Sequence, residues 1–190
     1  MKSSWPAICC AALLSACATS RPDHFYILTA QPPGVAESKA APSTAITLKM
    51  TVPAVVDRPE MVLNTSADAV MVLEHERWAA PLPDLMVQTL GRDLERRRND
   101  LIVVDRGFDR PGSPSVKITV EILQLSLRQG GAATLEAHWR VVDPRSGTDL
   151  LGSNVVHSPL ANNGYAAVAQ ALSECLGLLA DSLVTKLPAA

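Results

Sequence analysis

The sequence predicts an α/β (α+β) sandwich, in which a mixed, mainly antiparallel sheet carries two long helices packed on one face. Three observations support this fold class. Short runs of alternating apolar residues, typical of half-buried strands, occur in both halves of the chain. Two stretches repeat apolar residues at spacings of three and four, as amphipathic helices do. The order is strands, helix, strands, helix, and the 190 residues suit one domain.

The first half begins with strands and a long loop. Residues 24–28 form a short run that favours a strand, and residues 31–45 are rich in Pro, Ala and Ser and indicate a loop. Apolar residues alternate over residues 46–52, a half-buried strand that a proline ends. Residues 61–64 and 69–74 are two further strand candidates, and the turn-like NTSAD between them predicts a hairpin.

The first helix is predicted within residues 81–100. Its spacing puts five apolar residues on one face: Leu82, Leu85, Met86, Leu90 and Leu94. Asp84 lies in the first turn and three arginines, 96–98, lie in the last, which suits the helix dipole. This arginine run is either a solvated helix end or a patch for phosphate or anionic lipid. Residues 101–105 then predict a short buried strand.

The next part predicts an antiparallel meander over residues 115–129, 134–143 and 150–158. Within the first of these strands the apolar residues change from even to odd positions. A continuous strand therefore needs a β-bulge near Ile122 and Leu123.

The last helix is predicted over residues 165–187, where apolar residues keep helical spacing. Polar residues interrupt the apolar surface, so we expect an amphipathic helix and no membrane span. Asn162 or Asn163 is its expected cap, and Cys175 lies on the face expected to be buried.

Composition and motifs argue against several function classes. The net charge of -2 and the 19% of charged residues do not favour a nucleic-acid partner. The cysteines do not form a disulfide framework, and no thiolate metal motif is present. The four histidines share no ligand spacing, and no hydrolase or nucleotide-binding motif occurs. We therefore expect no enzyme activity, no cofactor and no metal. The histidines are His24, His75, His138 and His157.

The N-terminus has the order of a secretory signal: a positive charge, a short apolar run and small residues. The run is about half of the roughly 20 residues that a membrane span needs. Cleavage at ACA (residues 16–18) would release a soluble protein, whereas LSAC (residues 14–17) resembles a bacterial lipobox. We favour the lipobox over secretion and over a structural role for Cys17. Residues 1–16 are then the signal peptide, 17–45 the lipidated N-terminus, short strand and linker, and 24–190 one domain.

A lipobox cysteine carries at least two acyl chains. Because each buried methylene contributes about 0.8 kcal/mol, two chains hold a protein firmly on a membrane. Gram-negative lipoproteins with Asp after the cysteine stay in the inner membrane, and this chain has Ala18 there. We therefore expect an outer-membrane location that faces the periplasm.

Three further residues are candidate contacts for a partner or lipid. Trp78 either seals the junction of sheet and helix from a loop or is an exposed aromatic contact. His138 and Arg140 alternate with apolar residues and should face away from the core.

Three segments resemble the ABC-type transport auxiliary lipoproteins, also called PqiC-like after paraquat-inducible protein C. They are FYIL shortly after the lipobox, VPAVVDRPEMV (residues 52–62) and HERWAAPLPDLMVQTLGRDLERR (residues 75–97). The resemblance covers nearly all of the chain after Cys17. Glu is common in the family where Ala80 stands, and the linker over residues 31–45 is longer than expected.

The resemblance implies an accessory lipoprotein for an inner-membrane complex with mammalian-cell-entry (MCE) domains, which moves lipids between the two membranes. Phospholipid and further copies of the chain are implied partners. Two alternatives stay open. One is a structural envelope lipoprotein that tethers outer-membrane assemblies, and the other is a periplasmic hydrolase with a dispersed site.

Overall fold

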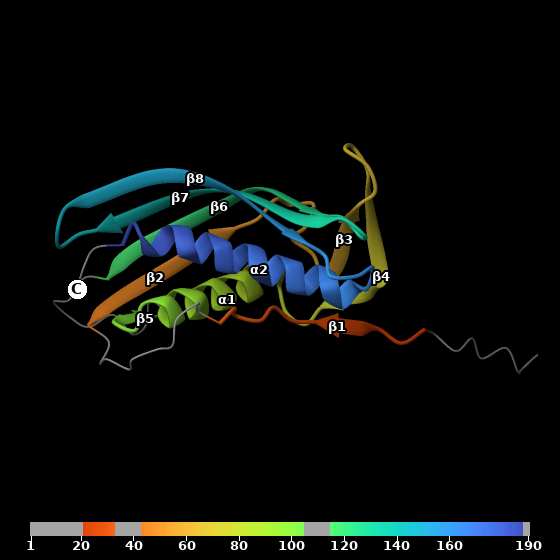
Figure 1. Ribbon diagram of the computed structural model, residues 1–190, viewed down its shortest axis with the longest axis horizontal. Helices are drawn as coiled ribbons and strands as arrows, with labels where there is room; N and C mark the ends of the chain where they lie inside the picture. Colours follow the sequence, from red (N-terminus) through yellow and green to blue (C-terminus); the bar gives the residue numbers. More distant parts are fainter. Residues whose placement is uncertain (1–20, 33–42, 105–114, 188–190) are drawn as a thin grey trace, which may run out of the picture.

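The computed structural model describes residues 21–32, 43–104 and 115–187. Within these ranges the chain forms two sheets and two helices (Figure 1), in the order expected from the sequence. The elements are β1 (His24–Tyr26), β2 (Thr44–Thr51), β3 (Glu60–Asn64), β4 (Val70–Trp78), α1 (Leu82–Arg97), β5 (Leu101–Val103), β6 (Val116–Leu127), β7 (Ala132–Asp143), β8 (Thr148–Pro159) and α2 (Tyr165–Val184).

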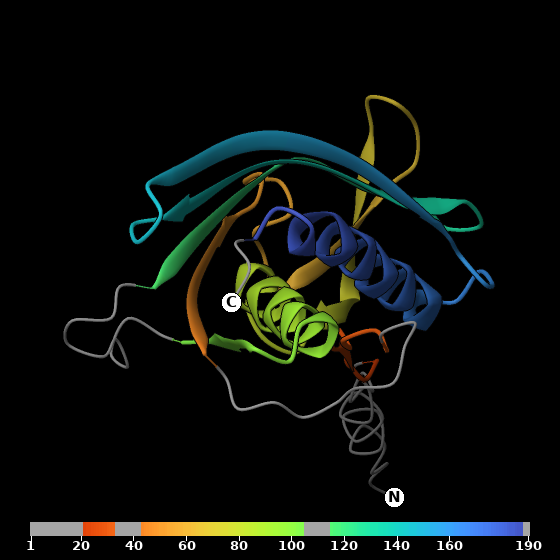
Figure 2. The same ribbon diagram turned by 60° about the vertical axis from the view of Figure 1, so that its left-hand side comes forward.

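The larger sheet has five strands in the order β5-β2-β6-β7-β8. β6, β7 and β8 form the antiparallel meander, and β2 pairs in parallel with both β5 and β6. Figure 2 shows that this sheet curves around α1 and α2, which lie side by side on its concave face. The predicted fold class is confirmed. β5 differs in detail, because it is an edge strand whose Ile102 is exposed.

The strands divide into two sheets, whereas the sequence predicted one. The smaller sheet has the order β1-β4-β3, with the expected β3–β4 hairpin and a parallel β1. The division follows from the end of β2: Pro53 has no N–H for a ladder, and its carbonyl accepts turn hydrogen bonds from Val56 and Asp57. Asn64 ties the two sheets together, because its side-chain oxygen accepts a hydrogen bond from the Leu127 N–H.

The predicted β-bulge in β6 is confirmed. Ile122 lies opposite Ala137 and Gln124 lies opposite Glu136, so Leu123 has no partner on β7. Its side chain is 40% exposed. The extra residue restores the apolar face of the strand toward the helices.

α2 is the central core helix. It has the length and the hydropathy of a membrane span, but 67% of its most apolar stretch is buried inside the fold. Cys175 is fully buried, as expected. The predicted asparagine cap is wrong: Gly164 is the N-cap residue, and the Asn162 side chain accepts a hydrogen bond from the Gly164 N–H outside the helix.

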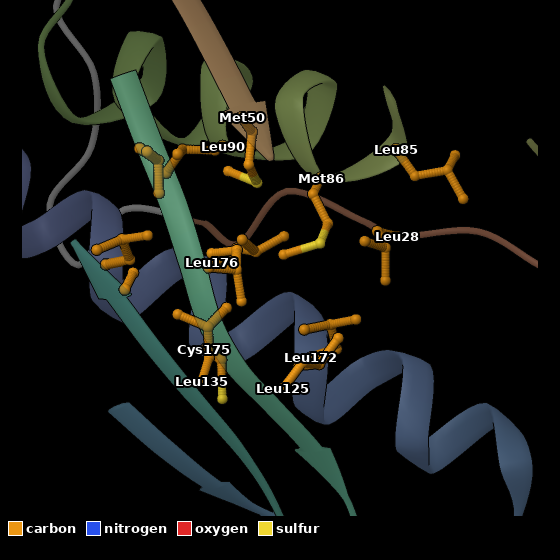
Figure 3. Close-up of a cluster of buried hydrophobic side chains, with 14 of the residues drawn as sticks. Leu28, Met50, Leu85, Met86, Leu90, Leu125, Leu135, Leu172, Cys175 and Leu176 are labelled. Atoms are coloured by element: carbon orange, nitrogen blue, oxygen red, sulfur yellow. The ribbon is translucent and has the colours of Figure 1, made fainter. Parts of the chain in front are cut away.

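One continuous hydrophobic cluster joins both helices to both sheets. Figure 3 shows its centre, where α1 and α2 meet the strands and the segment after β1. Side chains that point into this centre include Leu28, Met50, Met86, Leu90, Leu125, Leu135, Leu172 and Leu176.

Candidate functional site

Residues 21–32, the N-terminal segment, run along one side of the two helices (Figure 1). The segment begins as β1, which pairs in parallel with the end of β4. Tyr26 lies opposite Trp78, and its carbonyl accepts a hydrogen bond from the Ala79 N–H. The short β-type run predicted from the sequence is therefore a real strand at the edge of the smaller sheet.

Beyond β1 the N-terminal segment is fixed to both helices. Leu28 and Ala30 are buried, which removes apolar surface from water at this contact. Three hydrogen bonds join the backbone of the segment to helix side chains. They run from the Thr29 N–H to Ser173 Oγ (3.1 Å), from Arg96 to the Ala30 carbonyl (2.8 Å) and from the Gln31 N–H to Asp93 Oδ1 (2.7 Å).

A buried ion pair lies under this contact. Asp93 is fully buried, and its Oδ1 also accepts a hydrogen bond from Arg97 at 3.1 Å. Asp93 Oδ2 is buried without a hydrogen-bond partner among the described residues. Burial raises the pKa of the Asp93 carboxyl above its ordinary value, because the charged form loses its water. Arg97 in turn donates to Asp181 on α2, so this pair links the two helices.

The arginine run at the end of α1 makes contacts that the sequence did not predict. Arg96 donates to the Ala30 carbonyl, Arg97 is bonded to Asp93 and Asp181, and Arg98 is bonded to Asp100. Arg97 and Arg98 are partly buried in these contacts, whereas Arg96 is exposed, as a solvated helix end predicts.

A polar cluster between β1 and β4 fixes the register of β1. Glu76 accepts hydrogen bonds from Tyr26 at 2.5 Å and from His24 at 3.1 Å. Burial, aided by the hydrogen bond to Glu76, raises the pKa of Tyr26 to about 12. Although burial acts against it, the pKa of Glu76 is lowered by these hydrogen bonds. His75 is bonded separately to Asp23 at 2.9 Å.

A groove of about 490 Å³ lies between the N-terminal segment and the first half of α2. Phe25 and Ile27 border it and are each 63% exposed, because they point away from the face that carries Tyr26 and Leu28. Among the described residues that line it there is no carboxylate, imidazole or basic group, which favours binding over acid–base chemistry. The lining residues are Phe25, Tyr26, Ile27, Thr29, Gln31, Ala166, Ala169, Gln170 and Ser173.

A second groove of about 370 Å³ lies farther along α2, against the end of β8. It is more polar. Ser158 donates a hydrogen bond to Glu174 there, while the neighbouring His157 is bonded to Thr134 on the opposite face of the sheet. Ser158 and His157 therefore do not form a pair of nucleophile and base. Among the described residues, no group of three or more His, Cys, Asp or Glu could hold a metal ion.

The structure does not bring the sequence-predicted contact residues together. Cys17 lies outside the described residues. Trp78 is the last residue of β4 and only 4% exposed, so it belongs to the core and is not an exposed aromatic contact. His138 and Arg140 are exposed on the convex face of the larger sheet, as expected, and Arg140 makes two hydrogen bonds to Asp149 (2.8 and 2.6 Å). A contact role for His138 and Arg140 stays a prediction.

Sequence reasoning missed the exposure of Phe25 and Ile27. The run HFYIL favours a strand, but it is too short to show which of its two apolar faces is buried. When a strand at the edge of a sheet has large side chains on both faces, one face is buried and the side chains of the other are left exposed. That signal was present in the four residues 25–28.

Comparisons with known proteins agree with this fold. The family model described as "ABC-type transport auxiliary lipoprotein component" matches residues 26–184. No curated protein matches the sequence. A crystal structure of an uncharacterised protein superposes with a TM-score of 0.73 at 15% identity, covering 88% of this chain and 100% of the other. Protein XCC0632 from Xanthomonas campestris gives 0.64 at 18% identity, covering 85% and 92%. The chain therefore belongs to the ABC-type transport auxiliary lipoprotein family.

Proposed function

We propose that this chain is a periplasmic lipoprotein, anchored in the outer membrane, that serves an ABC-type lipid transport system with MCE domains. The family match over residues 26–184 carries this proposal, because it spans almost the whole described fold. The sequence supplies no P-loop, so the energy for transport would come from another subunit.

The anchor is part of the same proposal. The signal peptidase would remove residues 1–16, and acyl chains on Cys17 would hold the domain on the membrane. Ala18 after the cysteine favours transfer to the outer membrane. The domain would then begin in the short strand that follows the anchor and extend to the end of the chain.

The proposed role is to receive or dock rather than to catalyse. The groove beside the N-terminal segment has an apolar surface with amide and hydroxyl groups, and its described lining residues include no carboxylate, imidazole or basic group, which suits a binding component. Its partners would be the MCE-domain complex of the inner membrane, phospholipid and further copies of the chain.

Crosslinking in intact envelopes, followed by mass spectrometry, tests the proposed role. We expect crosslinks to subunits of an inner-membrane transporter with MCE domains. The matched control is Cys17→Ala, which should leave the domain unlipidated and remove those crosslinks. If the lipidated protein crosslinks only to outer-membrane structural proteins, it is a tether and the transport role is wrong.

Intact-mass measurement of the purified protein tests the anchor by itself. We expect a chain that begins at Cys17 and carries a diacylglycerol, with or without a third acyl chain. An unmodified amino terminus on a soluble product would contradict the anchor.

A further inference from the structure

Two large apolar side chains stand out from the start of the fold. Phe25 and Ile27 share one side of the extended N-terminal segment and border the groove against α2, where Ala166 and Ala169 continue the apolar surface. Exposed apolar side chains that adjoin one another often mark a site of contact with a protein or a membrane, whereas isolated ones do not. These two residues are available to such a phase because the opposite side of the segment makes the contacts to the fold.

The chain before this surface is short. Phe25 follows Cys17 by eight residues, and a fully extended chain spans at most about 3.6 Å per residue, or about 29 Å. If Cys17 carries the acyl anchor, as the proposed function requires, Phe25 cannot lie farther than this from the bilayer surface. The membrane is therefore the apolar phase within reach of Phe25 and Ile27 in every copy of the protein.

The surface is also held rigidly by the fold. Hydrogen bonds to Ser173, Arg96 and Asp93 fix the segment just after Ile27, and β4 fixes the segment just before it. In Figure 1, β1, β3, β4 and the first turns of α2 lie at the same end of the molecule. β4 also carries exposed apolar side chains at residues 70–72, in the part of the strand that precedes its pairing with β1.

Three carboxylates beside β1 are paired, which favours contact with a membrane surface. Asp23 is bonded to His75, Glu76 to His24 and Tyr26, and Glu60 to Arg58 and Arg77. A paired carboxylate costs less to bring against the headgroup region than an isolated one. Arg21 is exposed and lies four residues after Cys17, where it can meet lipid phosphates.

We propose that the outward side of the N-terminal segment, formed by Phe25 and Ile27 beside the groove, is a membrane-docking surface. It rests on the bilayer that holds the anchor and turns the β1–β4 end of the domain toward the lipid. The β7–β8 turn, at the opposite end in Figure 1, then projects into the periplasm. This proposal depends on the lipid anchor of the proposed function, but not on the identity of the transporter.

The test uses the full lipidated protein in vesicles of phosphatidylethanolamine and phosphatidylglycerol. An environment-sensitive fluorophore is placed at position 25, 27 or 151 through Phe25→Cys, Ile27→Cys or Leu151→Cys. Leu151 is the matched control, because it is an equally large apolar residue, 78% exposed, on β8. The native Cys175 is fully buried and does not compete for the label.

We expect brominated acyl chains in the vesicles to quench the labels at positions 25 and 27 and to leave the label at position 151 unchanged. Equal quenching at all three positions, or none at position 25, would overturn the proposal. Energy transfer between labels at position 25, without lipid quenching, would overturn it in favour of contact with a second copy. Intact mass establishes lipidation beforehand, so failure of the anchor is distinguished from failure of docking.

Discussion

Gly152 lies directly beneath the indole ring of Trp139, its partner across β7 and β8. A Cβ atom at position 152 would lie 2.2 Å from Trp139 Cζ2, which is far inside van der Waals contact. The indole cannot move freely, because its N–H donates a hydrogen bond to Asn154 at 2.7 Å. We expect Gly152→Ala to lower the free energy of unfolding by about 1–3 kcal/mol, the usual cost of overpacking.

Urea denaturation of the purified protein measures this cost. Ser153→Ala is the control, because Ser153 is the exposed neighbour on the same strand and its change should stay within about 0.5 kcal/mol. Equal midpoints for Gly152→Ala and the wild type would show that the indole has another position open to it.

The buried carboxyl of Asp93 should make stability depend on pH. Burial raises its pKa in the folded state above the ordinary 3.8, so folding favours the protonated form. Its contribution to stability is full below that ordinary value and is lost as pH rises through the folded pKa. Asp93→Asn keeps an oxygen for the Gln31 N–H but does not titrate.

Denaturation of the wild type and of Asp93→Asn at several pH values isolates this group. The series starts just below the ordinary pKa of 3.8 and extends to neutral pH. We expect the stability of the wild type relative to the variant to fall as pH rises. A constant or rising difference would mean that Arg97 stabilises the ionised form at least as strongly as burial opposes it.

At the scale of elements, the bulge in β6 determines which single residue can be deleted from the strand without turning the other side chains to the opposite face. Without Leu123 the pairs Ile122–Ala137 and Gln124–Glu136 become consecutive, and every other side chain keeps its face. Deletion of Thr119, in the regular part of the strand, turns at least two buried aliphatic residues outward in either register. We expect the second deletion to cost about 3–6 kcal/mol more, since each such residue contributes about 1.5–3 kcal/mol. Urea denaturation of the two variants measures the difference, and equal losses would contradict this account.

The elements that could be predicted from sequence are those whose periodicity is long enough to define a face. The twelve-residue run of β6 showed both its alternation and the bulge, and the two helices showed their buried stripes. β1 is three residues long, so its type followed from composition, while its parallel partner β4 and its exposed face did not. Trp78 was ambiguous for a related reason: a single indole at a strand end has no periodic neighbours to assign its side.

Ion pairs between distant segments were also beyond sequence reasoning. The arginine run of α1 reads as a charged helix end until Asp181 and the Ala30 carbonyl, from remote parts of the chain, are placed beside it. The division of the strands into two sheets could not be predicted for the same reason. The turn after Pro53 redirects the chain, and no local sequence pattern indicates which strands pair after it.

At the scale of the whole molecule, the two sheets share one hydrophobic cluster. β3 and β4 contribute Met61, Leu63 and Trp78 to the core that β6, β7 and both helices complete. The Asn64–Leu127 hydrogen bond joins the sheets directly, and the N-terminal segment joins the smaller sheet to both helices. Because neither sheet buries its apolar face without the helices, the described fold should unfold as one unit.

The two core tryptophans test this directly, because each reports on one sheet. Trp78 lies in β4 of the smaller sheet and Trp139 lies in β7 of the larger sheet, while the third, Trp5, precedes Cys17 and is expected to be removed with the signal peptide. In Trp139→Phe the fluorescence follows the smaller sheet, and in Trp78→Phe it follows the larger sheet.

We expect the fluorescence midpoint of each variant in urea to coincide with its own far-ultraviolet circular dichroism midpoint, although the two variants differ in overall stability. Comparison within one variant removes the cost of the substitution itself. If the Trp78 signal of Trp139→Phe is lost at lower urea than the circular dichroism, the smaller sheet opens separately. β1 would then detach with the smaller sheet, since β1 pairs only with β4 among the described strands. Separate opening of this membrane-facing end would change how the anchor restrains the domain.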